Sequence, residues 1–567
     1  MIECEFVKQS REIVENFLQS VVVVDDYGQL DKLNESPEPA PSEELKSPPE
    51  RPTIGASKSS VTITKEEPMK DDKKETADEE TNKEEDRFNA KQVIDSFADK
   101  GITCAVLTPI GQKDLDNLAN TISKLALTSD VLIFDWALGD TGGRTRNLIQ
   151  NLVCPDEKNK DRLRLIVIYT IENRILDILN EIFSEIKKIP EGPKVEKNEA
   201  EYSLITSSAK IIVTLKQAAK VPPEAKELLE RKVPFDKLAD CVIGEFTEMT
   251  HGLVPNVALQ SIAEIRDNTS KLLTRFNREL DAPYLTHRTL LVNPEEAEEH
   301  LVALIAEELV SILEEKDVKA KASIETIKHW IDYIKPENDN FTLKIEGGES
   351  KNWTKAQVIE LLDKGIDIIN EGKHTIGQGS FVKNARNSNL SRMYYCSDAD
   401  NLNLDHKFAV LSTLRSFYGK PIPKLNLGTI IKTVDGTEEY YICIQPRCDC
   451  VRIDTSRKFL FLPLVNADGD VFDLVINHGD QFLKFKIKNS SYDVLPLDFS
   501  GDAAWKGRIF SRFQDEAYFF KDMANKSYKW IGEMKIEHAL SLSSVYSAEL
   551  SRVGPNESEW LRRSKVK

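Results

Sequence analysis

Two short stretches decide the fold class: Val21-Val22-Val23-Val24-Asp25-Asp26 and Val131-Leu132-Ile133-Phe134-Asp135. In each stretch, four apolar residues run without interruption and an acid follows at once. A continuous apolar run of this length is typical of a strand that is buried on both faces of a parallel sheet. Ligands of an open α/β sheet bind outside the carboxyl ends of its strands. The two stretches therefore predict neighbouring buried strands that bring three carboxylates to one edge of a sheet.

The segments around these strands alternate between amphipathic helices and apolar strands. We expect helices at 6–18, 90–100, 113–127, 144–152 and 172–186, and further strands at 102–107, 163–168 and 211–213. Short apolar strands separated by helices indicate a parallel sheet with helices on both faces. The first 220 residues therefore predict a doubly wound, mainly parallel five-stranded α/β sheet.

The segment 28–87 interrupts this alternation. It is rich in Pro, Glu, Lys, Ser and Thr, and it carries 17 acidic and 10 basic residues. Such a segment buries too little apolar surface to offset the entropy of ordering it, so we expect a disordered acidic insertion. A folded domain tolerates the insertion because the cost of closing a loop grows only logarithmically with its length. Residues 1–27 and 88–220 are thus expected to form one domain.

The rest of the chain has a different pattern. We expect a helical connector at 221–285, a mainly helical region at 286–425 and a strand-rich α+β region of unknown function at 426–567. The segment 483–488 alternates strictly between apolar residues and lysine, as a half-buried antiparallel strand does. Asp435-Gly436 and Asp468-Gly469 are typical of hairpin turns.

Length and charge exclude several classes of protein. A chain of 567 residues predicts about three or four domains. The net charge of −18 argues against a broad nucleic-acid-binding surface, which would be basic. No apolar run approaches the roughly 18 residues that span a bilayer, and the first residues are acidic, unlike a signal peptide. The 8 scattered cysteines favour a reducing compartment. We expect a cytoplasmic protein without a membrane or nucleic-acid partner.

The converging acids predict a specific chemistry. Like charges at Asp25, Asp26 and Asp135 repel each other unless a cation or a proton intervenes. Mg²⁺ prefers oxygen ligands and suits such a cluster, and one carboxylate can then act as a nucleophile toward phosphorus. Two further strands end in polar residues: Thr170 offers a hydroxyl, and Lys216 offers a charge suited to a phosphoryl oxygen.

This order of residues resembles the receiver domain of two-component response regulators. The resemblance covers the chain from Met1 to about residue 220, and it depends on Val-Val-Asp-Asp at 23–26, Leu-Ile-Phe-Asp at 132–135, Thr170 and Lys216. It implies a doubly wound five-stranded sheet and a histidine kinase as the phosphoryl donor. The resemblance also implies a role for each residue: Asp135 as phospho-acceptor; Asp25, Asp26, Asp135 and the backbone carbonyl of Ala137 as Mg²⁺ ligands; Thr170 as the switch hydroxyl; and Lys216 as the partner of the phosphoryl group.

The chain departs from the receiver pattern in three places. About 60 residues separate the acid pair from the helix that follows it, and Gln217 rather than proline follows the lysine. The segment between the fourth helix and Lys216 is also long. The layout resembles the enlarged response receiver proteins of bacteria, some of which belong to anti-phage two-component systems such as Detocs. That resemblance implies a bacterial signalling protein with a role in antiviral defence.

Several functions fit these observations. The first is a phospho-acceptor that acts as a response regulator or a phosphate buffer, with a downstream effector protein and no DNA-binding output. The second is a pseudo-receiver scaffold, and the third is a receiver that controls a catalytic C-terminal domain. We expect a regulatory acceptor rather than a turnover enzyme. A phosphatase of the haloacid-dehalogenase type needs a second acid two residues after its nucleophile, and here that residue is Ala137.

Cys443, Cys448 and Cys450 form a separate candidate site. Clustered thiolates bind Zn²⁺, although a structural site has four ligands and only His478 lies near in sequence. A nucleophilic cysteine beside Arg447 is a second interpretation, and simple packing in a strand and turn is a third.

Overall fold

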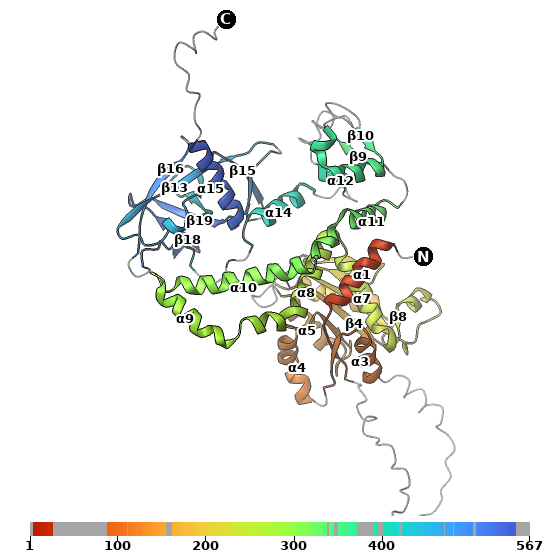
Figure 1. The fold of residues 1–567 in the computed structure, drawn as a ribbon. Helices are drawn as coiled ribbons and strands as arrows, with labels where there is room; N and C mark the ends of the chain where they lie inside the picture. Colours follow the sequence, from red (N-terminus) through yellow and green to blue (C-terminus); the bar gives the residue numbers. More distant parts are fainter. Residues whose placement is uncertain are drawn as a thin grey trace, which may run out of the picture. The chain divides into compact units, whose positions relative to one another are not determined.

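The computed structural model describes residues 4–26, 88–109, 112–154, 162–336, 340–344, 350–370, 390–394, 401–416, 418, 422–469, 471–479, 481–490, 492–502 and 506–551. The chain falls into two compact units (Figure 1). Unit 1 comprises Met1–Asn277 and Leu304–Tyr333, and unit 2 comprises Arg278–Ala303 and Ile334–Lys567. The predicted insertion at 28–87 lies outside the described residues, and the finer division into domains stays a prediction. Among the described helices, none is both long enough and apolar enough to cross a membrane.

Unit 1 is built on a sheet whose central strands are parallel. In spatial order these strands are β2 (Thr103–Leu107), β1 (Ser20–Val24), β3 (Val131–Phe134), β4 (Arg164–Thr170) and β7 (Ala209–Lys216). This is the 2-1-3-4-5 order of the doubly wound fold, so the predicted fold class is confirmed. Three short strands extend the sheet to eight: β5 (Glu196–Asn198), β6 (Ser203–Ile205) and β8 (Lys232–Val233).

Helices cover both faces of this sheet. One apolar core contains residues of α4 (Gln112–Leu125), α5 (Gly143–Val153) and α6 (Ile175–Lys187). The other contains residues of α1 (Glu5–Phe17), α3 (Ala90–Ala98), α7 (Leu238–Thr250) and α8 (Leu253–Arg275). Val22 and Val24 face the first core, and Val21 and Val23 face the second, because successive side chains of a strand point to opposite faces. A strand that packs on both faces needs apolar residues at every position, which explains the unbroken valine run.

The register of the sheet aligns the strand ends. Val24 lies opposite Phe134 in β3, and Phe134 lies opposite Ile168 in β4. The residues that follow β1 and β3 therefore leave the sheet side by side, at its carboxyl edge.

The following elements lie between β7 and the strand-rich region of the chain. They are η2 (Lys226–Arg231), η3 (Phe235–Lys237), η4 (Arg278–Leu280), α9 (Asp281–Leu290), α10 (Glu296–Glu315), η5 (Val318–Ala322), α11 (Ile324–Ile334), β9 (Phe341–Lys344), β10 (Ser350–Trp353), α12 (Lys355–Asn370), η6 (Leu390–Met393) and α14 (Asn401–Thr413).

Unit 2 contains a nine-stranded antiparallel sheet, which confirms the strand-rich α+β character predicted for the C-terminal region. Its elements are β11 (Thr429–Thr433), β12 (Tyr440–Cys443), η7 (Arg447–Asp449), β13 (Ser456–Asn466), β14 (Leu474–His478), β15 (Gln481–Ile487), β16 (Leu495–Ser500), β17 (Arg512–Gln514), β18 (Ala517–Lys521), β19 (Ser527–Glu533) and α15 (Ile536–Leu550). The spatial order is β14-β15-β13-β12-β11-β19-β18-β17, and β16 pairs with β13.

One of the two predicted hairpin turns is wrong. Asp435-Gly436 joins the antiparallel neighbours β11 and β12, and Gly436 has the positive φ of 81° that such a turn favours. Asp468-Gly469 lies between β13 and β14, but β15 is inserted between these strands in the sheet. The dipeptide therefore starts a longer connection, because the strand that pairs with β13 comes later in the chain.

Truncating a central strand residue should destabilise unit 1 selectively. Leu132 of β3 is 1% exposed, whereas Leu163, just before β4, is 44% exposed. We expect Leu132→Ala to cost about 2–5 kcal/mol through lost burial and a residual cavity, and Leu163→Ala to cost under about 1 kcal/mol. Native-state hydrogen exchange of peptides from β1, β3 and β4 measures the free energy of unfolding of unit 1 separately from that of unit 2. If both variants lose the same unfolding free energy, β3 is not a buried central strand of unit 1.

Candidate functional site

Two buried carboxylates lie at the carboxyl edge of the parallel sheet. Asp25 follows β1 and is 2% exposed, and Asp135 follows β3 and is 5% exposed. The backbone N–H of Asp135 donates to the carbonyl of Val24 at 2.9 Å, which continues the β1–β3 pairing into the site. The structure thus brings together the two acids that the sequence placed after neighbouring strands.

Lys216 bridges these two acids. It ends β7 and is 4% exposed, and its Nζ lies 2.6 Å from Oδ2 of Asp25 and 2.8 Å from Oδ1 of Asp135. Burial by itself would lower the pKa of Lys216, but the charges of Asp135 and Asp25 and their hydrogen bonds raise that pKa above its ordinary value. The lysine is therefore charged at neutral pH, and it neutralises part of the negative charge of the crevice.

Asp26 is the least satisfied of the three acids. Its Oδ2 accepts a hydrogen bond from the backbone N–H of Gly139 at 2.7 Å. Its Oδ1 is buried and has no hydrogen-bond partner among the residues that the structure describes. Burial, and to a lesser degree the charge of Asp135, raises the pKa of Asp26, although the Gly139 hydrogen bond and Lys216 oppose this. An oxygen atom in this state is suited to a cation.

The loop after β3 holds Asp135 in place. The backbone N–H of Ala137 donates to Oδ2 of Asp135 at 3.0 Å, and the hydroxyl of Thr145 donates to the carbonyl of Asp135 at 2.9 Å. The loop then passes over the fully buried Trp136 at Gly142, whose φ is 94°. A Cβ at Gly142 would lie 2.2 Å from a ring atom of Trp136, so only glycine fits there. Sequence reasoning missed these three supports, although the Gly142-Gly143 pair is a visible turn signal.

Thr170 lies on the same edge of the sheet. It ends β4, the strand between β3 and β7, and it is 1% exposed. It pairs with Leu215, the residue before Lys216. Its hydroxyl oxygen accepts a hydrogen bond from the backbone N–H of Glu172 at 3.1 Å. The site thus contains all the strand-end residues that the sequence pointed to.

Two aromatic rings that sequence reasoning missed lie beside the lysine. The Nζ of Lys216 is 5.8 Å from the ring centroid of Phe88 and 5.9 Å from that of Tyr169, and both rings are 1% exposed. The hydroxyl of Tyr169 donates to the carbonyl of Val233 at 2.6 Å. Phe88 is the first described residue after the segment that follows Asp26, so the chain leaves and re-enters the described fold at this site. An isolated phenylalanine at the end of a long polar stretch was the available signal.

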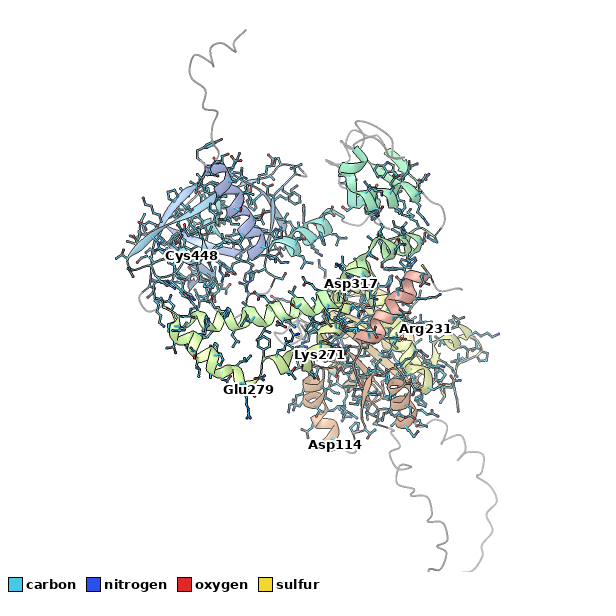
Figure 2. The ribbon with its side chains drawn as sticks, in the orientation of Figure 1. Asp114, Arg231, Lys271, Glu279, Asp317 and Cys448 are labelled. Carbon is cyan, nitrogen blue, oxygen red and sulfur yellow. The ribbon has the colours of Figure 1, made fainter. Side chains whose placement is uncertain are left out.

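The cysteine motif of unit 2 contains two buried cysteines and one exposed cysteine. Cys443 and Cys450 are buried, whereas Cys448 is exposed on the strand-rich unit (Figure 2). Burial raises the pKa of Cys443, and it raises the pKa of Cys450 to about 12. The thiol of Cys450 donates to the carbonyl of Pro446 at 3.3 Å. These two cysteines are therefore neutral packing residues near pH 7.

Metal-ligand geometry is not preformed in the part of the chain that the structure describes. No three His, Cys, Asp or Glu side chains there lie together as a metal-binding group. The acids of the crevice do not form such a group either. There Lys216 supplies the positive charge between Asp25 and Asp135.

The comparison with known families agrees with this site. Residues 17–221 match the family model of the response receiver domain. No curated protein and no solved structure matches the chain significantly. The matched segment runs from the end of α1 past β7, so it contains the five central parallel strands, the three acids, Thr170 and Lys216. Residues 17–221 of this chain are therefore a response receiver domain, the domain type of two-component signalling.

Proposed function

We propose that this protein accepts a phosphoryl group on Asp135 and so acts as a phospho-acceptor in a two-component pathway. The observation that carries the proposal is the contact between Asp135 and Lys216 at the carboxyl edge of the sheet, where Nζ lies 2.8 Å from Oδ1. A nucleophilic carboxylate next to a buried cation is the arrangement that phosphoryl transfer to an acid needs, because the cation offsets the charge of the incoming oxygens.

The proposed reaction uses a phosphohistidine of a histidine kinase as the donor. One carboxylate oxygen of Asp135 forms a bond to phosphorus, the phosphorus–nitrogen bond of the donor breaks, and the imidazole leaves with the electron pair. The product is an acyl phosphate on Asp135. Lys216 already lies beside this carboxylate, so it can follow the phosphoryl oxygens without a large movement of the backbone.

The residues of the crevice fit a divalent cation. Oδ1 of Asp26 is buried without a hydrogen-bond partner among the described residues, and the raised pKa of this group reports the cost of its charge. We assign Mg²⁺ to Asp25, Asp26, Asp135 and the backbone carbonyl of Ala137, the ligand set that the receiver resemblance implies. When bound, the ion would neutralise the charge that develops on the transferred group.

The proposed response begins at Thr170. Its hydroxyl is at the end of the strand next to β3, and it accepts its hydrogen bond from Glu172 in the connection to α6. A phosphoryl group on Asp135 offers this hydroxyl a new acceptor, so the β4–α6 connection would rearrange. That change would signal to a downstream effector protein, or the domain would serve as a phosphate buffer for its kinase.

One observation favours a second candidate, a pseudo-receiver scaffold. Lys216 already pairs with both Asp25 and Asp135, so the crevice has an internal cation without any metal. In a scaffold this bridge would be purely structural. The predictions below separate the two candidates.

Replacing Asp26 should stabilise the metal-free protein. The raised pKa of Asp26 means that the folded state binds more protons than the unfolded state just above pH 3.8, so its charge costs stability at neutral pH. We expect Asp26→Asn to raise the midpoint of unit 1 unfolding at pH 7 in EDTA, and to lose that advantage below pH 3.8. Mg²⁺ should stabilise the wild type more than the variant, as read by hydrogen exchange of β1 and β3 peptides.

Asp240→Asn is the matched control for Asp26→Asn. Although burial opposes it, the hydrogen bond from Lys100 lowers the pKa of Asp240, so this carboxylate contributes stability above pH 3.8 that is lost as the pH falls. The control should therefore be less stable than the wild type at pH 7. If Asp26→Asn also destabilises at pH 7, or if Mg²⁺ stabilises it as much as the wild type, the assigned metal site is wrong.

Removing the bridging lysine should be costly. Lys216→Met leaves two buried carboxylates without their cation, and breaking a buried pair typically costs about 3–5 kcal/mol. Adding Asp25→Asn should recover part of this loss. The exposed i,i+4 pair of Lys91 with Asp95 provides the control, since Lys91→Met should cost much less stability than Lys216→Met. Hydrogen exchange of peptides from unit 1 measures the stability of the wild type and of the three variants. An equal loss of stability in Lys216→Met and Lys91→Met would contradict the bridging role of Lys216.

Phosphorylation itself separates the acceptor from the scaffold. We expect the protein to acquire one phosphoryl group from acetyl phosphate and Mg²⁺ on a phosphate-affinity gel, and Asp135→Asn to abolish the shifted band. Asp177→Asn is the control, because Asp177 is an exposed acid in the first turn of α6. If the wild type neither shifts nor binds beryllofluoride, the protein is a scaffold. A shift that persists in Asp135→Asn would place the acceptor elsewhere.

A further inference from the structure

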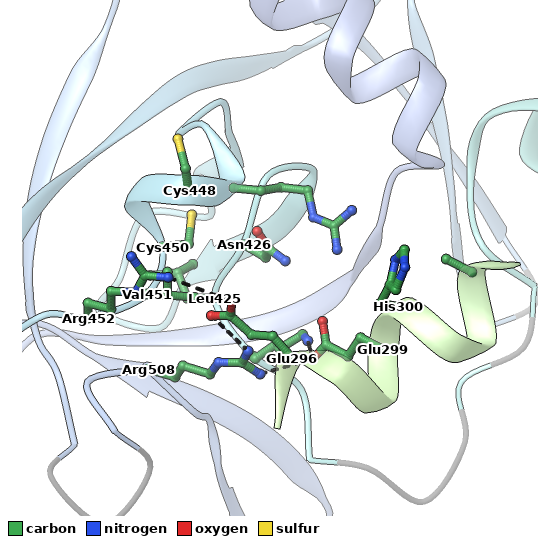
Figure 3. Close-up of a pocket in the computed structure, with 13 residues that line it drawn as sticks. Glu296, Glu299, His300, Leu425, Asn426, Cys448, Cys450, Val451, Arg452 and Arg508 are labelled. Atoms are coloured by element: carbon green, nitrogen blue, oxygen red, sulfur yellow. Dashed lines mark hydrogen bonds and ion pairs between the residues drawn. The ribbon is translucent and has the colours of Figure 1, made fainter. Parts of the chain in front are cut away.

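Two adjoining cavities lie within unit 2. The first has a volume of about 430 Å³ and is drawn in Figure 3, and the second has a volume of about 720 Å³. Glu299, Lys424 and Arg508 belong to the walls of both. Each volume is in the range of small-molecule sites, and the shared wall residues place the two cavities next to each other.

The first cavity has an excess of positive charge. Lys424, Arg447, Arg452 and Arg508 line it against only two carboxylates, and His300 and Asn426 add polar groups. In a chain with a net charge of −18, such a concentration of cations stands apart from the rest of the sequence. It predicts an anionic ligand, because guanidinium groups bind phosphate oxygens through paired hydrogen bonds.

The first turn of α10 supplies the opposing acids. Glu299 Oε1 lies 2.6 Å from Nζ of Lys424 and 2.9 Å from Nη1 of Arg508. Glu296 reaches Arg452 and Arg508 only at 3.7 Å, and Figure 3 shows these carboxylates directed at the cations. Among the described residues, no carboxylate lies within ion-pair distance of Arg447. The two glutamates therefore neutralise part of the positive charge of the cavity, and Arg447 can pair with a ligand.

The second cavity is aromatic. Tyr418, Phe510, Tyr518 and Trp530 line it, together with Ile422 and Pro423. The rings of Tyr418 and Trp530 meet edge to face with centroids 4.8 Å apart, and those of Tyr518 and Trp530 do so at 6.2 Å. Aromatic side chains in a cavity provide faces and edges on which a planar heterocycle packs.

We propose that the two cavities together bind a nucleotide, with its phosphates in the cationic cavity and its base in the aromatic one. A nucleotide is the ligand that would contact both cavities. A simple anion would not contact the aromatic walls, and an uncharged aromatic compound would not pair with Arg447 and Arg452. Glu299 then acts as an internal competitor, since it occupies the two cations that both cavities share.

Calorimetric titration of the full-length protein tests this proposal. AMP and ADP are compared with adenosine and with pyrophosphate, in EDTA so that no divalent ion links the ligand to the receiver acids. We expect at least one nucleotide to bind about tenfold or more tightly than both its nucleoside and pyrophosphate. If pyrophosphate or adenosine binds as tightly as every nucleotide, or if no nucleotide binds, the proposal is overturned.

Variants with opposite signs distinguish a ligand site from a merely structural ion-pair cluster. Arg447→Ala should weaken nucleotide binding about tenfold or more, whereas Glu299→Gln should tighten it, because Lys424 and Arg508 are released. Trp530→Leu should weaken nucleotide binding and leave pyrophosphate binding unchanged. Arg512→Ala removes an exposed arginine of β17 on the same unit and should have no effect. If Glu299→Gln weakens binding, or if Arg512→Ala weakens it as much as Arg447→Ala, the assigned cavity is wrong.

Discussion

The structure of the receiver domain depends on the balance of charge at one edge of its parallel sheet. Asp25 and Asp135 are almost completely buried there, and two carboxylates so close together would repel each other strongly in a medium of low polarity. Lys216 resolves this repulsion by reaching both from the end of β7. The three residues come from strands that are far apart in the sequence, so the charge balance exists only when the sheet is assembled in its observed order.

The same balance links the fold to the proposed chemistry. Lys216 pairs with Asp135, Ala137 donates its backbone N–H to the carboxylate of Asp135, and Thr145 donates its hydroxyl to the backbone carbonyl of Asp135. These contacts hold the carboxylate in a fixed orientation. Asp26 has a buried oxygen atom without a hydrogen-bond partner among the described residues, and in our proposal this cost favours the binding of a cation. In the function that we propose, the crevice gains further compensation when it takes up a metal ion and a phosphoryl group.

The sequence predicted the features that follow from local pattern. The valine run before Asp25 and the apolar run before Asp135 identified buried parallel strands, because only a strand with two covered faces is apolar at every position. The receiver order of acids, Thr170 and Lys216 followed from the same strand ends. The sequence pattern could not predict the direct contact of Lys216 with both acids. That contact depends on the order of the strands in the sheet, in which β7 lies two strands away from β3.

Other features escaped prediction because they depend on distant partners. The strands β5 and β6 are three residues each and carry little hydrophobic periodicity. Their conformation depends on pairing, of β6 with β7 and of β5 with β6. The turn at Asp468-Gly469 has the composition of a hairpin, but a later strand is placed beside β13. The cavities of unit 2 combine α10 with residues more than a hundred positions later in the chain. No local pattern signals such a meeting.

In the function that we propose, Asp135 is the residue that carries the phosphoryl group. Borohydride reduces an acyl phosphate to the alcohol, so an aspartyl phosphate is converted to homoserine at the modified position. We would phosphorylate the full-length protein, reduce it with borohydride and locate the homoserine by peptide mass spectrometry. The account predicts homoserine at position 135 and only in samples that contained Mg²⁺. Homoserine at Asp25 or Asp26, or at position 135 without any divalent ion, would contradict it.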